Sequence, residues 1–323
     1  MRKLLLLALL FACGLVLAGE PPSRFGVDAP ELARLGDHAV GVRTLHLVQS
    51  AQFDVLAFDA AKGTAPLVDR ALTVELWYPA QPAPHAPRVV YSASLPSEPP
   101  APAAHFSIPG IAVRDAPASG TGHPLIIVSH GYSNDPNAMS WLTENLASKG
   151  YVVAAIHHDD PPITDRSRFA GPLMRRPLDI AFVARSLQST LAEDHLVDPS
   201  RTALVGYSMG GYGVLTAAGA TLDPDGAAKL VPGGLMLPLA RGGALRGSLK
   251  VNGLRAVVAI SPAGGGTLAA WGAEGMRAIT VRANGVASSA LRMAAAAASA
   301  RSALSSASGS ATAASNAKSA MGC

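Results

Sequence analysis

The chain has 323 residues and a formal net charge of +4, and 49% of its residues are hydrophobic. This length and apolar content are enough for one large α/β domain or two small ones with a full core. The basic residues are scattered, with no Lys/Arg run long enough to follow a phosphate backbone, so nucleic acid is not an expected partner. The two cysteines, Cys13 and Cys323, build neither an internal disulfide framework nor a cysteine metal site.

The N-terminal segment 1–19 has the features of a secretory signal peptide. Two basic residues precede an apolar stretch over 4–17, and small residues suited to cleavage follow it. The stretch is shorter than the roughly 20 residues of a spanning helix, so we expect no membrane span. Cys13 weakly resembles a lipoprotein cleavage site, which Phe11 fits poorly. We therefore predict a periplasmic or secreted protein and keep a lipoprotein as the less favoured alternative.

Strand-like and helix-like runs alternate along the middle of the chain. The β-rich runs 40–48 and 72–78 are typical of antiparallel strands that begin a sheet. Continuous apolar runs, as in parallel strands covered on both faces, occupy 124–128, 151–156, 203–205 and 254–260. Helical patterns occupy 137–149, 177–193 and 212–218. The alternation predicts a mostly parallel, doubly wound α/β sheet with antiparallel first strands, within a domain over 38–281.

Three stretches lack such patterns. Residues 80–123 are rich in proline, alanine and serine, and we expect a long connection over the surface or a cover over the site. Residues 221–252 are rich in glycine and leucine and allow no assignment. Residues 282–323 are rich in alanine and serine and contain no strand-like run, so we expect a disordered or helical tail.

The stretch Gly206-Tyr207-Ser208-Met209-Gly210 follows an apolar strand and leads into a helix. This G-x-S-x-G pattern is typical of a nucleophile elbow, in which glycines permit close backbone approach and the serine hydroxyl points to the top of a parallel sheet. The alternative is a glycine-rich turn with an incidental serine. The flanking strand and helix favour the elbow, with Ser208 as nucleophile.

An elbow serine needs backbone N–H groups that hold the oxyanion. One donor is the N–H of the residue after the nucleophile, Met209, and the other comes from the loop after an earlier strand, where Tyr132 follows His130 and Gly131. Gly131 permits the tight turn of this loop. We interpret His130 as a residue that fixes the loop by hydrogen bonding rather than as a base, because the triad histidine follows the serine in this arrangement.

Several ordered motifs over roughly 40–275 resemble the dienelactone-hydrolase-like branch of the α/β-hydrolases and, equally, the platelet-activating-factor acetylhydrolases. The motifs are VELWYPA from Val74, residues 109–115, HPLIIVSHGY, SKGYVVAAIHH, RPLDIAFV and GYSMGGYG. The resemblance implies an α/β-hydrolase fold and a serine esterase acting on carboxylic esters or lactones. It also implies Ser208 as nucleophile and Tyr132 and Met209 as oxyanion donors.

The family's acid and histidine follow the nucleophile, and here the chain departs from the pattern. It has no histidine after His195 and no acidic residue after Glu274. Ser261 stands at the end of the 254–260 strand, where the acetylhydrolases carry an aspartate. Asp223 and Asp225 follow the elbow helix too soon to match. The triad is incomplete in this sequence, and the alternative to an esterase is an inactive relative with at most a ligand-binding role.

The composition beyond Val281 offers a reason for the missing partners. The sheet's last strands are missing or replaced by Ala-, Ser- and Arg-rich sequence. One interpretation is a genuine alanine-rich tail. The other, which we favour, is a frame change in a GC-rich gene, because out-of-frame GC-rich codons yield these residue types.

The run His157-His158-Asp159-Asp160 contains types that bind metals. Neighbouring histidines on a strand point to opposite faces, so we interpret the run as a polar loop at the rim of the site. We expect neither a metal nor a cofactor, and a small-molecule ester as the substrate.

Overall fold

The computed structural model describes residues 33–59, 61–95, 102–162, 165, 168–226, 231, 234–264, 270–271 and 273–279. The chain divides into one unit that ends at Arg34 and a second that begins at Leu35, and the account below concerns the second. The predicted signal peptide over 1–19, the lipoprotein alternative at Cys13 and the predicted tail over 282–323 lie outside the described residues.

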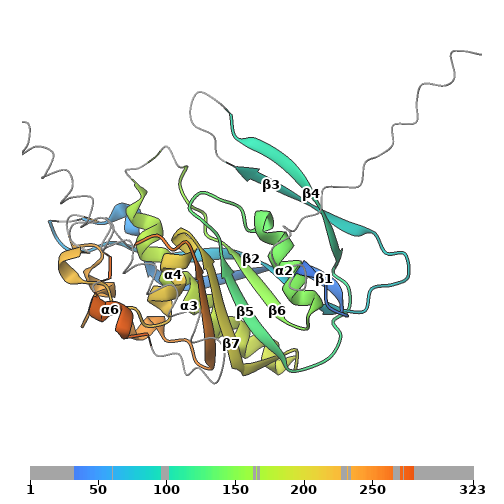
Figure 1. The fold of residues 1–323 in the computed structure, drawn as a ribbon. Coiled ribbons are helices and arrows are strands. Elements are labelled where there is room, and N and C mark those ends of the chain that lie inside the picture. Colours follow the sequence, from blue (N-terminus) through green and yellow to red (C-terminus); the bar gives the residue numbers. More distant parts are fainter. Residues whose placement is uncertain are drawn as a thin grey trace, which may run out of the picture. The chain divides into compact units, whose positions relative to one another are not determined.

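The second unit is built around an eight-stranded sheet with the order β3-β4-β1-β2-β6-β5-β7-β8 (Figure 1). The strands are β1 Ala39–Phe53, β2 Leu67–Ala80, β3 Arg88–Leu95, β4 Ala104–Arg114, β5 His123–Ser129, β6 Val152–His157, β7 Val197–Tyr207 and β8 Leu254–Ile260. Strand β5 pairs in parallel with β6 and β7, and β7 pairs in parallel with β8. Strand β2 is antiparallel to both β1 and β6. The predicted parallel sheet with antiparallel first strands is confirmed.

Helices cover the parallel strands on both faces, because alternate side chains of an apolar strand point in opposite directions. The α-helices are α2 Ser140–Ser148, α3 Ala170–Glu193, α4 Met209–Ala217 and α6 Ala273–Arg277, and the 3-10 helices are η1 Val55–Ala57, η2 Pro136–Met139, η4 Leu237–Leu239 and η5 Arg246–Leu249. Leu125 and Ile127 pack in the cluster that contains α3 and α4. Ile126 and Val128 pack with α2 on the other face. No helix among the described residues has the length and apolarity to cross a membrane.

Helix α3 begins at Ala170, seven residues before the predicted start at Pro177. Pro177 therefore lies inside the helix, where its ring removes a backbone donor. The preceding turns form nevertheless, because Leu173 and Met174 are buried in the same cluster as Met209 of α4. Tertiary packing thus decides this helix start, which the local pattern placed at the proline.

The proline-rich stretch 80–123 contributes two strands, which corrects the expectation of an irregular surface connection. β3 and β4 form an antiparallel pair at one edge of the sheet. The buried carboxylate of Glu144 anchors them, since its Oε1 accepts hydrogen bonds from Tyr91 Oη (2.8 Å) and from the N–H groups of Ile111 (2.8 Å) and Ala112 (3.1 Å). A partner on α2, distant in sequence, fixes this hairpin, and no local pattern signals it.

Strand β8 is the other edge of the sheet in the part of the chain that the structure describes. Its Val257 side chain is buried on the face covered by α3 and α4. On the opposite face Val258 is 42% exposed and Ile260 is 36% exposed. The elbow strand β7 therefore lies one strand from this edge.

Candidate active site

Ser208 lies on the sharp turn between β7 and α4, as the elbow interpretation predicts. Its φ of 54° and ψ of −114° are a conformation that costs free energy for a residue with a side chain. Backbone hydrogen bonds hold it: the Ser208 N–H donates to Ile260 O (3.0 Å), and its C=O accepts from Tyr212 N–H (3.1 Å) and Ala263 N–H (2.8 Å). The fold thus maintains a strained serine at the carboxyl edge of the parallel strands.

Two glycines of the motif, Gly206 and Gly210, lie where other backbone atoms approach too closely for a side chain. A Cβ at Gly206 would lie 2.2 Å from Gly210 O, and a Cβ at Gly210 would lie 1.9 Å from Ser129 O. Both distances are far below any contact that a carbon atom tolerates, and the opposing atoms belong to the backbone. The elbow turn can therefore close only with glycine at Gly206, and it can pack against the end of β5 only with glycine at Gly210.

The loop after β5 lies beside the elbow. A Cβ at Gly131 would lie 3.2 Å from the Tyr207 ring and 3.6 Å from Ser208 Cβ. Met209 is the first residue of α4, and the first N–H groups of a helix have no partner within the helix. The structure therefore brings Gly131 and Ser208 together, with the N–H groups of Tyr132 and Met209 following directly in sequence.

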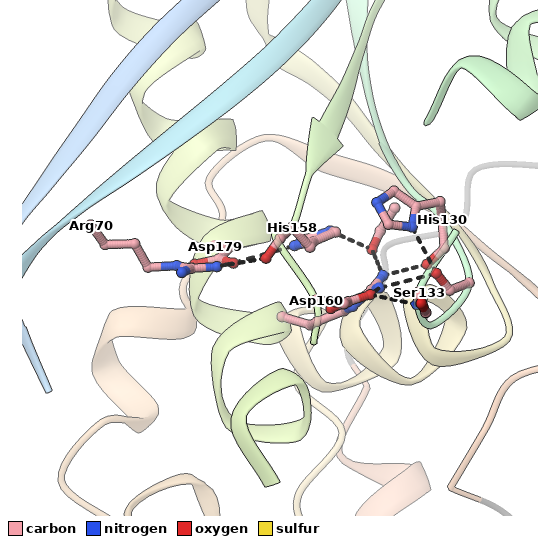
Figure 2. Close-up of polar contacts among 9 residues, drawn as sticks. Arg70, His130, Ser133, His158, Asp160 and Asp179 are labelled. Atoms are coloured by element: carbon pink, nitrogen blue, oxygen red, sulfur yellow. Dashed lines mark hydrogen bonds and ion pairs between the residues drawn. The ribbon is translucent and has the colours of Figure 1, made fainter. Parts of the chain in front are cut away.

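A buried chain of polar contacts runs from Arg70 through Asp179 and His158 to the end of β5, where this loop begins (Figure 2). Asp179 accepts two hydrogen bonds from Arg70, both 2.7 Å long, and a third from His158 Nδ1 at 3.2 Å. His158 Nε2 then accepts from the Ser129 hydroxyl at 2.8 Å. Burial alone would raise the pKa of Asp179, but the charge and hydrogen bonds of Arg70 outweigh it and lower that pKa. Burial, reinforced by the charge of Arg176, lowers the pKa of His158 to about 4, so His158 is neutral at pH 7.

A second buried ion pair, between Arg176 and Asp160, contacts the loop itself. Arg176 Nη1 donates to His130 O, and Nη2 donates to Gly131 O (3.1 Å) and to Asp160 Oδ2. Asp160 Oδ2 also accepts from the Ser133 N–H at 2.8 Å. Burial lowers the pKa of Arg176, and the charge and hydrogen bond of the neighbouring Asp160 oppose this. An arginine guanidinium is charged at pH 7 in proteins.

His130 fixes the loop in the way the sequence interpretation expects. Its Nδ1 lies 2.7 Å from Gly131 O, and because a carbonyl only accepts, Nδ1 carries the proton. Burial, and then the charge of Arg176, hold the pKa of His130 well below its ordinary value. The imidazole is therefore neutral at pH 7.

None of the nine histidines of the sequence hydrogen-bonds to Ser208 Oγ, and all nine lie among the described residues. His158 contacts Ser129 instead, in the order of a serine–histidine–aspartate triad with Asp179. Ser129 has no exposed surface, and its Oγ also accepts from Arg176 Nη1 at 3.2 Å. We therefore interpret this trio as structural support, since no substrate reaches Ser129.

Sequence reasoning missed this buried network. Arg176 and Asp179 are charged residues on the face of α3 that also buries Leu173 and Ile180, which is a usable signal for a buried polar cluster. Arg70, on β2, gave no comparable signal.

The loop with His157, His158, Asp159 and Asp160 borders a cleft of about 490 Å³. The lining residues are Ala71, Thr73, His130, Ser133, Asn134, His157, His158, Asp159 and Asp160. Within the described ranges, no group of three or more His, Cys, Asp or Glu side chains is placed to hold a metal ion. His157 and Asp159 border this cleft, whereas the side chains of His158 and Asp160 are buried in the polar contacts described above.

One comparison with known proteins covers the part of the chain that contains the elbow. Residues 114–233 match the family described as PETase, PET hydrolase-like. Cutinase est2 of Thermobifida alba is 32% identical over 116 residues, which are 36% of this chain and 37% of that cutinase. Cutinase cut1 of Thermobifida fusca is 30% identical over 36% of this chain and 34% of its own length. The chain thus spans little more than a third of the cutinases that it matches.

A ferulic acid esterase from Streptomyces cinnamoneus aligns with a TM-score of 0.39 and 27% identity over 53% of each chain. The matched relatives are cutinases, so the dienelactone-hydrolase-like or acetylhydrolase branch stays a prediction. The strand–elbow–helix unit, the mixed sheet and the two kinds of sequence match together show that the chain is a member of the α/β-hydrolase superfamily.

Proposed function

We propose that this protein is an exported serine hydrolase of carboxylic esters or lactones, with Ser208 as nucleophile. The observation that carries the proposal is the elbow itself: Ser208 is held at a φ of 54° between β7 and α4, beside the loop of Gly131. Strain of this kind persists where the surrounding structure enforces it, and it is concentrated at active sites. The matched cutinases support an ester substrate, and the segment 1–19 supports export.

The reaction follows from the groups that the elbow brings together. Ser208 Oγ attacks the ester carbonyl carbon, and the carbonyl oxygen becomes an oxyanion that accepts from the N–H groups of Tyr132 and Met209. Collapse of this intermediate expels the alcohol and leaves an acyl-enzyme, which water hydrolyses. Attack needs a group that takes the proton of the Ser208 hydroxyl and then gives it to the departing alcohol. Hydrolysis of the acyl-enzyme needs the same group to take a proton from water and return it to Ser208 Oγ.

The rate of ester turnover depends on the group that accepts the proton of Ser208. No histidine of this chain hydrogen-bonds to Ser208 Oγ, and an unassisted serine hydroxyl is a weak nucleophile. In subtilisin, loss of the catalytic histidine lowers kcat on the order of a millionfold. We therefore expect slow ester turnover and slow reaction with a fluorophosphonate. The second candidate function, binding of an ester without turnover, is favoured by this same absence of a base.

The test measures turnover of p-nitrophenyl butyrate and the rate of fluorophosphonate labelling, with the modified residue identified by mass spectrometry. We expect slow labelling at Ser208, which Ser208→Ala abolishes and which the exposed serine variant Ser189→Ala leaves unchanged. Labelling of Ser208→Ala at the wild-type rate would contradict the assignment of the nucleophile. Rapid labelling at Ser208 would instead show that a base acts on it. Binding of the ester with no turnover and no labelling would establish the second candidate.

A further inference from the structure

One buried ion pair, between Arg176 and Asp160, holds the backbone on both sides of Tyr132. Figure 2 shows its Asp160 beside Ser133. Arg176 donates to the carbonyl oxygen of Gly131 on one side, and Asp160 accepts from the N–H of Ser133 on the other. The side chain of Arg176 is 1% exposed and that of Asp160 is 3% exposed. Their contact with each other is thus shielded from water.

Peptide geometry links this contact to the oxyanion hole. The carbonyl of Gly131 and the N–H of Tyr132 belong to the same planar trans peptide unit, in which the C=O and N–H point in opposite directions. Arg176 holds the oxygen from the α3 side, so the N–H must point away from Arg176. Rotation of this peptide would break the contacts of Gly131 O with Arg176 Nη2 and with His130 Nδ1.

The same contacts strengthen Tyr132 N–H as a donor. Gly131 O accepts from a guanidinium and from an imidazole N–H, at 3.1 and 2.7 Å. Hydrogen bonds to a carbonyl draw electron density toward its oxygen and make the N–H of the same peptide more positive. The effect is large when the donor is charged and the surroundings exclude water, as they do here.

We infer that Arg176 and Asp160 are positioning residues of the oxyanion hole, which orient and polarise the Tyr132 N–H; this inference rests on the proposed function. Neither side chain touches the reacting atoms. Arg176 acts through the Gly131 peptide, and Asp160 acts by holding both Arg176 and the Ser133 N–H. The carboxylate also balances the charge of Arg176, which would otherwise be buried alone.

The main variant is Arg176→Lys, which keeps the charge and loses the forked donor geometry. Its matched control is Arg185→Lys, also on α3, since Arg185 Nη1 donates to the backbone carbonyls of Ser248 (2.7 Å) and Lys250 (3.2 Å), outside the oxyanion loop. Asp160→Asn is a second, isosteric variant, which tests the pair if Arg176→Lys does not fold.

One readout is independent of reactivity. In protein labelled with 15N-tyrosine, the six tyrosine amides report separately, and Tyr132→Phe assigns the signal of Tyr132. We expect Arg176→Lys to move the Tyr132 amide proton upfield and to leave the other five tyrosine amides in place. The other readout is the labelling rate of Ser208 by a fluorophosphonate, which should fall about tenfold, because complete loss of one oxyanion donor costs 100-fold or more.

The outcomes separate the inference from the proposed function. If folded Arg176→Lys and Asp160→Asn keep the wild-type Tyr132 amide position and label as fast as Arg185→Lys, the inference is wrong. If wild type labels no faster than Ser208→Ala, the proposed function fails, and the Tyr132 amide position alone then decides whether Arg176 orients this peptide. A shifted Tyr132 amide together with tenfold slower labelling supports both.

Discussion

At the scale of single residues, the elbow requires glycine where any side chain would collide with a neighbouring backbone segment. A Cβ at Gly210 would meet Ser129 O at 1.9 Å and His130 O at 2.7 Å, and backbone atoms cannot move aside as a flexible side chain can. Gly210→Ala should therefore lower the free energy of unfolding by about 1–3 kcal/mol and displace the oxyanion loop. Urea denaturation measures the change, with Gly247→Ala as control, since nothing lies within 4 Å of a Cβ there. Equal stability of the two variants would contradict the packing described for the elbow.

The buried imidazole of His158 makes stability depend on pH. Its pKa is lowered to about 4 by burial, whereas an unfolded chain titrates near pH 6.5. Above about pH 6.5 the group is neutral in both states. Between that pH and about 4 the unfolded chain binds a proton that the folded protein does not, so the free energy of unfolding falls as the pH falls, on the order of 3 kcal/mol in all.

Thermal unfolding across pH 7 to 4 checks this prediction in wild type, His158→Gln and the exposed control His105→Gln. A glutamine side chain has a donor and an acceptor for Asp179 and Ser129 but no proton to gain in this range. His158→Gln should show a shallower loss of Tm than wild type, and His105→Gln the wild-type loss. Parallel curves for all three proteins would show that His158 does not titrate as described.

At the scale of elements, β8 presents an open edge among the described strands. Val258 pairs in register with Val205 and Ile260 with Tyr207, so the exposed side chains of Val258, Ile260 and Tyr207 share one face. An edge strand with an apolar face is a template for association with another chain. We therefore expect the protein to associate as its concentration rises.

Val258→Lys should reduce this association, because a charge on an edge strand opposes pairing with another chain. The neighbouring residue is the matched control: Val257 is buried on the opposite face, so Val257→Lys should lower stability rather than association. Light scattering against concentration and Tm distinguish the two effects. A wild-type protein that stays monomeric at high concentration would contradict the association.

At the scale of the whole molecule, the elbow of Ser208 and the loop of Gly131 lie side by side, and no histidine hydrogen-bonds to Ser208 Oγ. The favoured reason is still the frame change after Val281. We predict that another reading frame beyond this codon encodes an apolar strand ending near an aspartate and, later, a histidine in a loop. The chain with that frame restored should turn over p-nitrophenyl butyrate rapidly, and Ser208→Ala should abolish the turnover. Stop codons or featureless sequence in both other frames would rule the hypothesis out.

The sequence by itself determined the elements whose causes are local. The apolar runs before Ser129 and Ser208 predict buried parallel strands, and the spacing of Gly206, Ser208 and Gly210 predicts the elbow, because these patterns reflect burial and steric needs within a few residues. The proline-rich stretch that forms β3 and β4 was not predicted, since its partner Glu144 is distant in sequence.

Only the tertiary structure decided how the charged side chains meet. Arg70 and Asp179 lie 109 positions apart in the sequence, and Arg176 reaches His130 across 46 positions. No periodicity in the sequence signals such contacts, because they form only when the fold brings β2, the end of β5 and α3 together and buries their charged side chains. The strong electrostatics of buried charge pairs then fixes the loop of Tyr132, and for this reason the support of the proposed oxyanion hole belongs to the fold rather than to the motif.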